Sequence, residues 1–200
     1  MIEHPDYARW CRLIRRLSPM ASSFKGPLYR ACTPVYANQR DLLTGAGAHK
    51  YGGRWNAPGR FPLVYLSQTV EGAIAETLGL SGRYGFDPAA HLPLTLVAID
   101  ATLANVLDLT NVHVRQAFRV TIKAMTDCPW KRENDHGREA FTQALARVAS
   151  DAGLEGIIVP SAVQRTIRNL NVFPANLAKK SKLEICRADK LPPPGPAGVV

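Results

Sequence analysis

The sequence predicts a single α+β domain with a mixed, largely antiparallel sheet and flanking helices. The first observation is length: 200 residues suffice for one domain that buries a core without disulfides or metal. The second is order along the chain. Segments with helical spacing and short apolar segments typical of strands are interspersed without the regular alternation of a parallel βαβ fold.

Three segments have the spacing of helices. From Tyr7 to Leu17, apolar residues recur every three or four positions, and arginines occupy the other face. From Thr69 the same spacing recurs, and Gly79 is placed to help end that helix. Asn134 or Asp135 is expected to cap a third helix.

Short apolar runs predict the strands 28–31, 63–66, 94–99, 103–109, 156–160 and 183–186. The polar, Gly-rich residues 44–53 are expected to form an active-site or surface loop, and 81–92 another loop. Ser161 would lie at the exit of the strand 156–160. The proline-rich end, 191–200, is expected to be extended or disordered.

Composition narrows the function classes. A formal net charge of +9 favours anionic partners. No helix-turn-helix, zinc-finger or aromatic RNA-binding signature is evident, so we do not expect direct nucleic-acid binding. The four cysteines never form a C-x-x-C pair, which favours reduced thiols and no metal site. The N-terminus does not read as a signal peptide, and no apolar run reaches roughly 20 residues, so a cytoplasmic protein without a membrane span is expected.

The most informative segment is 51–59, in which two adjacent glycines precede Arg54 and Trp55. Adjacent glycines let the backbone approach a ligand closely, and a guanidinium suits phosphate. Trp55 and Tyr65 would offer flat surfaces to a ring. The alternative is a tight hairpin turn with an exposed arginine and a core tryptophan.

Five motifs occur in the order typical of the RES domain family, which is named for its arginine, glutamate and serine: Tyr29-Arg-Ala31, Gly52-Gly-Arg-Trp-Asn56 with Pro58-Gly59, Val64-Tyr-Leu-Ser67 with Ala75-Glu76, Val159-Pro-Ser-Ala162, and Asn169-Leu-Asn-Val-Phe-Pro174. The chain resembles this family from about Leu28 to about Ile185. The predicted organisation is an N-terminal helix or extension (1–24), a RES domain (25–190) and a tail (191–200).

The resemblance implies a fold similar to that of the ADP-ribosyltransferases. It also implies a toxin of a bacterial type II toxin–antitoxin pair that consumes NAD at its nicotinamide–ribose bond, with water or phosphate as acceptor. It implies no metal. It also implies a hetero-oligomer with an antitoxin that carries an Xre-like helix-turn-helix domain. The implied catalytic residues are Arg54, Tyr65, Glu76 and Ser161, and the implied NAD-binding residues are Arg30, Gly52, Gly53, Arg54, Trp55 and Asn169.

The chemistry of these residue types fits that role. Positive charge develops on the ribose as the bond breaks, and the carboxylate of Glu76 would stabilise it. Arg54 would grip the pyrophosphate, and Arg30 the same group or the acceptor phosphate. Tyr65 would stack on or orient the ribose, and Ser161 would hydrogen-bond the nicotinamide amide or a phosphate.

Two alternatives stay open. The same NAD site would serve a protein ADP-ribosyltransferase, which delivers ADP-ribose to a macromolecule. A non-enzymatic basic module would instead bind nucleic acid or an acidic protein. Its affinity would fall steeply with salt concentration and would not depend on Glu76. Taken singly, Glu76 also fits a solvated helix glutamate, Tyr65 a core aromatic and Ser161 a turn residue.

Overall fold

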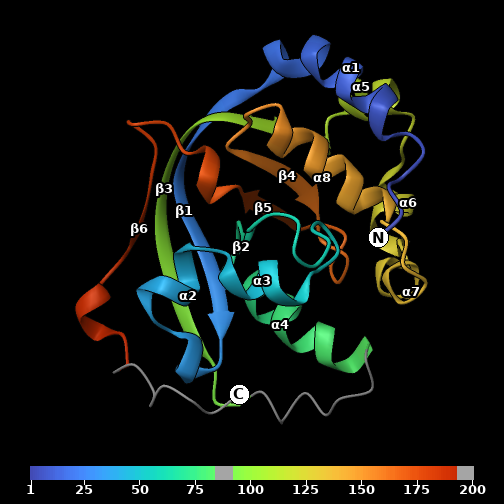
Figure 1. Cartoon of the computed structure of the whole chain (residues 1–200). Helices are drawn as coiled ribbons and strands as arrows, with labels where there is room; N and C mark the ends of the chain where they lie inside the picture. Colours follow the sequence, from blue (N-terminus) through green and yellow to red (C-terminus); the bar gives the residue numbers. More distant parts are fainter. Residues whose placement is uncertain (84–91, 193–200) are drawn as a thin grey trace.

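The computed structural model describes residues 1–83 and 92–192. It contains one mixed sheet with helices on its faces (Figure 1). The strands are β1 (Ser22–Cys32), β2 (Val64–Ser67), β3 (Thr95–Asp108), β4 (Gly156–Pro160), β5 (Arg168–Val172) and β6 (Lys182–Ile185). The predicted α+β class is confirmed.

The sheet is largely antiparallel, as predicted. Among the pairings between the described strands, β3–β4 alone is parallel. The pairings β1–β2, β2–β5, β5–β4, β4–β3 and β3–β1 close a circuit of five strands, and β6 adds to β3. Figure 1 shows β1 and β3 as two long, curved neighbours. The circuit places β1, β2, β4 and β5 close enough to contribute to one site.

The helices are α1 (Tyr7–Leu17), α2 (Gln39–Leu43), α3 (Ala46–Tyr51), α4 (Val70–Arg83), α5 (Val112–Phe118), α6 (Ile122–Asp127), α7 (Trp130–Asp135) and α8 (Phe141–Asp151). The predicted helix Tyr7–Leu17 is confirmed, with Trp10, Ile14 and Leu17 buried and the arginines of its last turn exposed. α8 packs on α1 and on β4 (Figure 1). One cluster of buried apolar side chains lies between these helices and the sheet, and a second lies among β1, β2, β3 and β5.

Three expectations about helices were wrong. Gly79 does not end α4, which continues to Arg83; a Cβ at Gly79 would meet a methyl group of Val163 at 2.9 Å, so the glycine serves close packing instead. Asn134 and Asp135 belong to α7, whereas α8 starts after Ala140. The segment 44–53 is not a continuous loop, because it contains α3.

Two expectations about strands also differ from the structure. The runs 94–99 and 103–109 form one continuous strand, β3, because β1 pairs along most of its length. The strand β5 was not predicted, since Asn169 and Asn171 break its apolar pattern. Those two polar residues share one face of β5, which is the face of the candidate site.

Part of two predicted irregular segments lies outside the described residues. Within 81–92, residues 81–83 belong to α4, and 84–91 are not described. Within the tail, 193–200 are not described. No helix in the two described ranges has the length and apolar character needed to cross a membrane.

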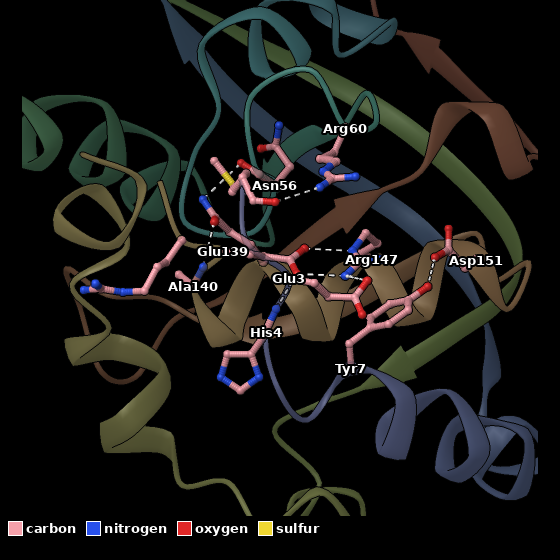
Figure 2. Close-up of polar contacts among 12 residues, drawn as sticks. Glu3, His4, Tyr7, Asn56, Arg60, Glu139, Ala140, Arg147 and Asp151 are labelled. Carbon is pink, nitrogen blue, oxygen red and sulfur yellow. Dashed lines mark hydrogen bonds and ion pairs between the residues drawn. The ribbon is translucent and has the colours of Figure 1, made fainter. Parts of the chain in front are cut away.

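The N-terminal segment is held against α8 by a buried arginine (Figure 2). Arg147 donates to both carboxylate oxygens of Glu139, at 2.7 and 2.8 Å, and to Glu3 at 3.0 Å. Its guanidinium also lies 3.4 Å from the ring centroid of Tyr7. Burial alone would lower the pKa of Arg147, but the hydrogen bonds and charge of Glu139 and Glu3 outweigh it and raise that pKa. The chain around Glu3 and Tyr7 is therefore tied to α8.

Candidate active site

A cavity of about 620 Å³ lies where β1, β2, β4, β5 and α4 meet the segment after α3. Of the residues predicted to bind or cleave NAD, those that line the cavity are Arg30, Gly52, Gly53, Arg54, Trp55, Tyr65, Glu76 and Asn169. Ser161 does not line it but contacts Glu76 from behind the wall. The fold thus brings together residues that are far apart in the sequence.

The carboxylate of Glu76 is held by the residue that follows β4 and by a residue of β5. Its Oε1 accepts a hydrogen bond from the hydroxyl of Ser161 at 2.6 Å and another from Nδ2 of Asn169 at 2.7 Å. Glu76 is partly exposed, so its side chain faces the cavity as well as these donors. The two contacts fix the orientation of the carboxylate before any ligand binds.

The hydrogen-bonding capacity of Ser161 is fully used. Its hydroxyl donates to Glu76 and accepts from the backbone N–H groups of Val163 at 3.1 Å and Gln164 at 3.0 Å. A serine hydroxyl has one proton to donate and two lone pairs to accept with, so no further donor or acceptor position remains. None of the histidines in the described ranges lines the cavity or hydrogen-bonds to the Ser161 hydroxyl.

Arg54, which also lines the cavity, is anchored by backbone carbonyl groups. Its Nη1 donates to the carbonyl oxygens of Met125 at 3.2 Å and Cys128 at 2.9 Å. Its own carbonyl oxygen accepts from the hydroxyl of Thr142 at 2.6 Å. Hydrogen bonds at the guanidinium and at the backbone carbonyl of Arg54 thus hold this cationic residue at the cavity.

Arg30 is anchored in a similar way from β1. Its Nη1 donates to the carbonyl oxygens of Asp41 at 3.1 Å and Leu42 at 2.7 Å, at the end of α2. Burial lowers the pKa of Arg30, yet a guanidinium titrates so high that it keeps its charge. The cavity therefore carries two guanidinium groups and one carboxylate.

The phenol of Tyr65 organises the segment 52–56. Its hydroxyl donates to Oδ1 of Asn56 at 2.7 Å and accepts from the backbone N–H of Trp55 at 3.0 Å. A Cβ at Gly53 would meet that hydroxyl at 2.6 Å, so this position requires glycine. Trp55 is buried in the core, as the hairpin-turn alternative expected, and reaches the cavity from there.

Gly52 serves the same segment by its backbone conformation. Its φ of 72° lies in the left-handed region, which favours glycine. A Cβ there would also meet the ring of Pro58 at 2.6 Å. The glycine pair therefore shapes the loop itself.

Sequence reasoning missed a clamp from α8 on this loop. Nε2 of Gln143 donates to the carbonyl oxygens of Gly53 at 2.8 Å and Asn56 at 3.3 Å, and also to Oδ1 of Asn134. Gln143 and Thr142 are both fully buried. Two adjacent polar residues in an otherwise apolar helical segment were the available signal, because buried polar groups need partners.

The start of α4 is fitted closely to β2. The hydroxyl of Thr69 caps the helix by accepting from the backbone N–H of Gly72 at 3.0 Å. A Cβ at Gly72 would lie 2.2 Å from Oγ of Ser67. This close approach sets the depth at which Glu76, one turn further on, enters the cavity.

Cys32 also lines the cavity, and burial raises the pKa of its thiol, which keeps it protonated and unreactive. Within the described part of the chain, no group of three or more His, Cys, Asp and Glu side chains is arranged to hold a metal ion.

Comparison with known families decides what kind of domain this is. The model of the RES domain matches residues 27–191. The chain belongs to the RES domain family. Among curated RES-family relatives, the NAD(+) phosphorylase MbcT of Mycobacterium tuberculosis and that of Mycobacterium bovis are each 29% identical to this chain over 133 residues, which is 66% of this chain and 67% of the relative.

A solved structure has the same fold. It is the crystal structure of the M. tuberculosis MbcT–MbcA toxin–antitoxin complex, with a TM-score of 0.66, 24% identity, and coverage of 88% of this chain and 89% of that one. This similarity confirms the RES fold of the chain. The expected likeness to the ADP-ribosyltransferases stays a prediction.

Proposed function

We propose that this RES-family protein is a toxin that cleaves the nicotinamide–ribose bond of NAD, with inorganic phosphate as the acceptor. The observation that carries the proposal is the Glu76 carboxylate, oriented by Ser161 and Asn169 within a cavity that also holds Arg30 and Arg54. A cavity of about 620 Å³ is of the size that encloses a cofactor.

In the proposed reaction a phosphate oxygen bonds to the anomeric carbon of the ribose as the bond to nicotinamide breaks. The bonding electron pair goes to the pyridinium nitrogen, so nicotinamide leaves neutral and needs no proton. Positive charge spreads over the ribose in the transition state, and the negative charge of Glu76 stabilises it. The other product is ADP-ribose carrying the phosphate at its anomeric carbon.

The two arginines suit two anions. Arg30 and Arg54 are anchored on different elements, β1 and the loop after α3. We assign Arg54 to the pyrophosphate and Arg30 to the attacking phosphate. A guanidinium suits either group, because it can donate two parallel hydrogen bonds to two oxygens of one phosphate. The name of the NAD(+) phosphorylase relatives supports phosphate rather than water as acceptor.

Ser161 acts by positioning Glu76, because its hydroxyl has no hydrogen-bonding capacity left for substrate. Tyr65 acts by shaping the loop 52–56 as well as by facing the ligand. NAD as substrate is consistent with the cytoplasmic location that we propose.

The proposed partner is an antitoxin of the Xre, helix-turn-helix type. The toxin–antitoxin complex with the same fold supports an antitoxin, and the net charge of +9 suits an acidic partner surface. Co-purification with the product of an adjacent Xre-type reading frame, with loss of NAD cleavage in the complex, is the expected result. Full activity of the complex would contradict this role.

The function is tested by incubating purified protein with NAD, with and without inorganic phosphate. Free nicotinamide is followed by chromatography and the second product by mass. We expect phosphate-dependent nicotinamide release that falls about 10²- to 10³-fold in Glu76→Gln, because the amide keeps the contacts with Ser161 and Asn169 but lacks the charge.

The matched control is Glu71→Gln, the same change at an exposed position of α4 outside the cavity, which should retain activity. Nicotinamide release at the same rate with and without phosphate would identify a glycohydrolase. ADP-ribose found on a protein would identify a transferase. NAD that stays intact in antitoxin-free, folded protein would exclude the proposal and favour a non-enzymatic binding module.

A further inference from the structure

Unpartnered buried polar atoms are concentrated on one strand at the cavity. Four buried side-chain nitrogen or oxygen atoms in the described ranges have no hydrogen-bond partner, and three of them belong to Asn169 and Asn171 of β5. They are Oδ1 of Asn169 and both amide atoms of Asn171. Buried polar groups in folded proteins almost always have partners, so such a cluster at a cavity needs an explanation, and a ligand that supplies the partners is one.

Both residues belong to the cavity wall. Residues two apart in a strand share one face, and Tyr65, which also lines the cavity, pairs directly with Asn171 across β2 and β5. Asn171 is fully buried within the lining of the cavity. The χ2 angle of asparagine is broad, so rotation of the amide can present its atoms to a bound ligand.

The chemistry of Asn169 fixes which of its atoms awaits a partner. The carboxylate of Glu76 only accepts hydrogen bonds, so the group that contacts it at 2.7 Å must be the Nδ2 donor. Oδ1 of Asn169 is therefore an acceptor without a donor. Asn171 supplies one further acceptor and one donor in either orientation of its amide.

We propose that Asn169 and Asn171 form the subsite that recognises the carboxamide of nicotinamide and rejects a carboxylate at the same position. This inference rests on the proposed NAD-cleaving function. The carboxamide NH₂ has two donor hydrogens, which match Oδ1 of Asn169 and Oδ1 of Asn171. Its carbonyl oxygen matches Nδ2 of Asn171. Each of the three unpartnered side-chain atoms therefore finds a complementary group on the carboxamide.

A carboxylate does not fit this subsite. It has no hydrogen to donate, so it would face the oxygen of Asn169 without a hydrogen bond, and the charge of Glu76 next to Asn169 would repel it. The carboxamide and the ribose are substituents of the same pyridine ring. Since Asn169 contacts Glu76, a carboxamide bound at Asn169 and Asn171 brings the ribose towards the Glu76 carboxylate.

The first test compares two substrates of the wild-type protein: NAD and nicotinic acid adenine dinucleotide, which carries a carboxylate in place of the carboxamide. We expect kcat/KM for NAD to be higher by roughly a thousandfold or more, because a site built for a hydrogen-bonding group discriminates strongly. Active protein that cleaves both dinucleotides within about tenfold would overturn the subsite and leave the proposed function standing.

The second test replaces Asn171 by leucine, which has a similar size and no polar atoms. We expect kcat/KM for NAD to fall roughly 100-fold, the preference over the acid to shrink to about tenfold, and the thermal midpoint to stay or rise, since an unpartnered amide is removed. A purely structural Asn171 would give the opposite pattern, a lowered midpoint with the preference unchanged. Asn171→Ser serves if the leucine variant does not fold.

The control is Asn176→Leu, at an asparagine outside the cavity whose Nδ2 donates to the carbonyl oxygens of Ser150 and Leu154. It should lower the thermal midpoint and keep the preference for NAD. If the wild-type protein cleaves neither dinucleotide, the proposed function fails, and binding of free nicotinamide against nicotinate then tests the subsite alone. Tighter binding of nicotinamide that is lost in Asn171→Leu would support it, and equal binding would overturn it.

Discussion

The hydroxyl of Ser161 lies 2.6 Å from Oε1 of Glu76, although the two residues are 85 positions apart. Ser161 follows the last residue of β4, and Glu76 lies in the first half of α4. The same serine oxygen caps the turn of residues 161–164 by accepting two backbone N–H groups. One side chain thus ties the strand exit, the turn and the carboxylate together.

Ser161→Ala tests this positioning role. We expect kcat for NAD cleavage to fall about 10- to 100-fold, because Glu76 loses one of its two orienting donors. The free energy of unfolding should fall by about 1 kcal/mol as the two N–H groups lose their acceptor. Steady-state kinetics and denaturant unfolding measure both. A covalent ADP-ribosyl adduct on Ser161, detected by mass spectrometry of the wild-type protein, would instead make the serine a nucleophile.

Gln143→Leu tests the clamp from α8. The carbonyl oxygens of Gly53 and Asn56 lose a donor in a buried place, so the free energy of unfolding should fall by about 3 kcal/mol. Because the loop carries Arg54, KM for NAD should rise about tenfold with a smaller change in kcat. The exposed Gln116 provides the control: Gln116→Leu should change the unfolding free energy by no more than about 0.5 kcal/mol. Equal effects of both variants would argue against a clamp.

Gly72→Ala tests the close approach of α4 to β2. The added Cβ would lie 2.2 Å from Oγ of Ser67 and 2.7 Å from a methyl group of Ile167, so the helix has to move. We expect a loss of about 1–3 kcal/mol in the free energy of unfolding, together with reduced NAD cleavage as Glu76 shifts. Gly47→Ala is the matched change within α3, where a Cβ meets nothing within 4 Å, and it should leave stability equal or slightly higher. Normal stability of Gly72→Ala would contradict the packing argument.

His4 makes stability depend on pH. Burial lowers the pKa of His4 below its ordinary value of 6.5, against the opposing charges of Asp6 and Glu139. The unfolded chain therefore binds a proton near pH 6.5 while the folded chain does not, and the free energy of unfolding falls as the pH drops from there towards the folded pKa. Above pH 6.5 this contribution is constant.

His4→Phe removes that titration and keeps a ring to stack on Trp10, whose centroid lies 5.0 Å from that of His4. Between about pH 7.5 and 5.5, the free energy of unfolding should fall less in the variant than in the wild type. Denaturant unfolding at a series of pH values measures the difference. Parallel pH profiles would show that His4 does not contribute.

Local patterns in the sequence were sufficient for several elements. The alternation of apolar residues and arginines predicted α1 over its full length, and the apolar run before Ser161 predicted β4. The ordered motifs predicted the family, and eight of the nine candidate site residues line one cavity. These features are readable because burial follows the period of a helix or strand, and because each motif is short and contiguous.

Other features depended on contacts between distant segments. β5 escaped prediction because its asparagines face a cavity, and Gly79 was misread because its small size serves contact with Val163 rather than a helix end. The clamp by Gln143 was not predicted either, because its partners Gly53 and Asn56 are distant in the sequence. The sequence by itself determined which chemical groups the protein carries, most of its strands, and three of its helices, α1, α4 and α8. Only the tertiary structure decided that Glu76 is held by Ser161 and Asn169, because the register of β5 against β2 and β4 and the depth of α4 fix those contacts.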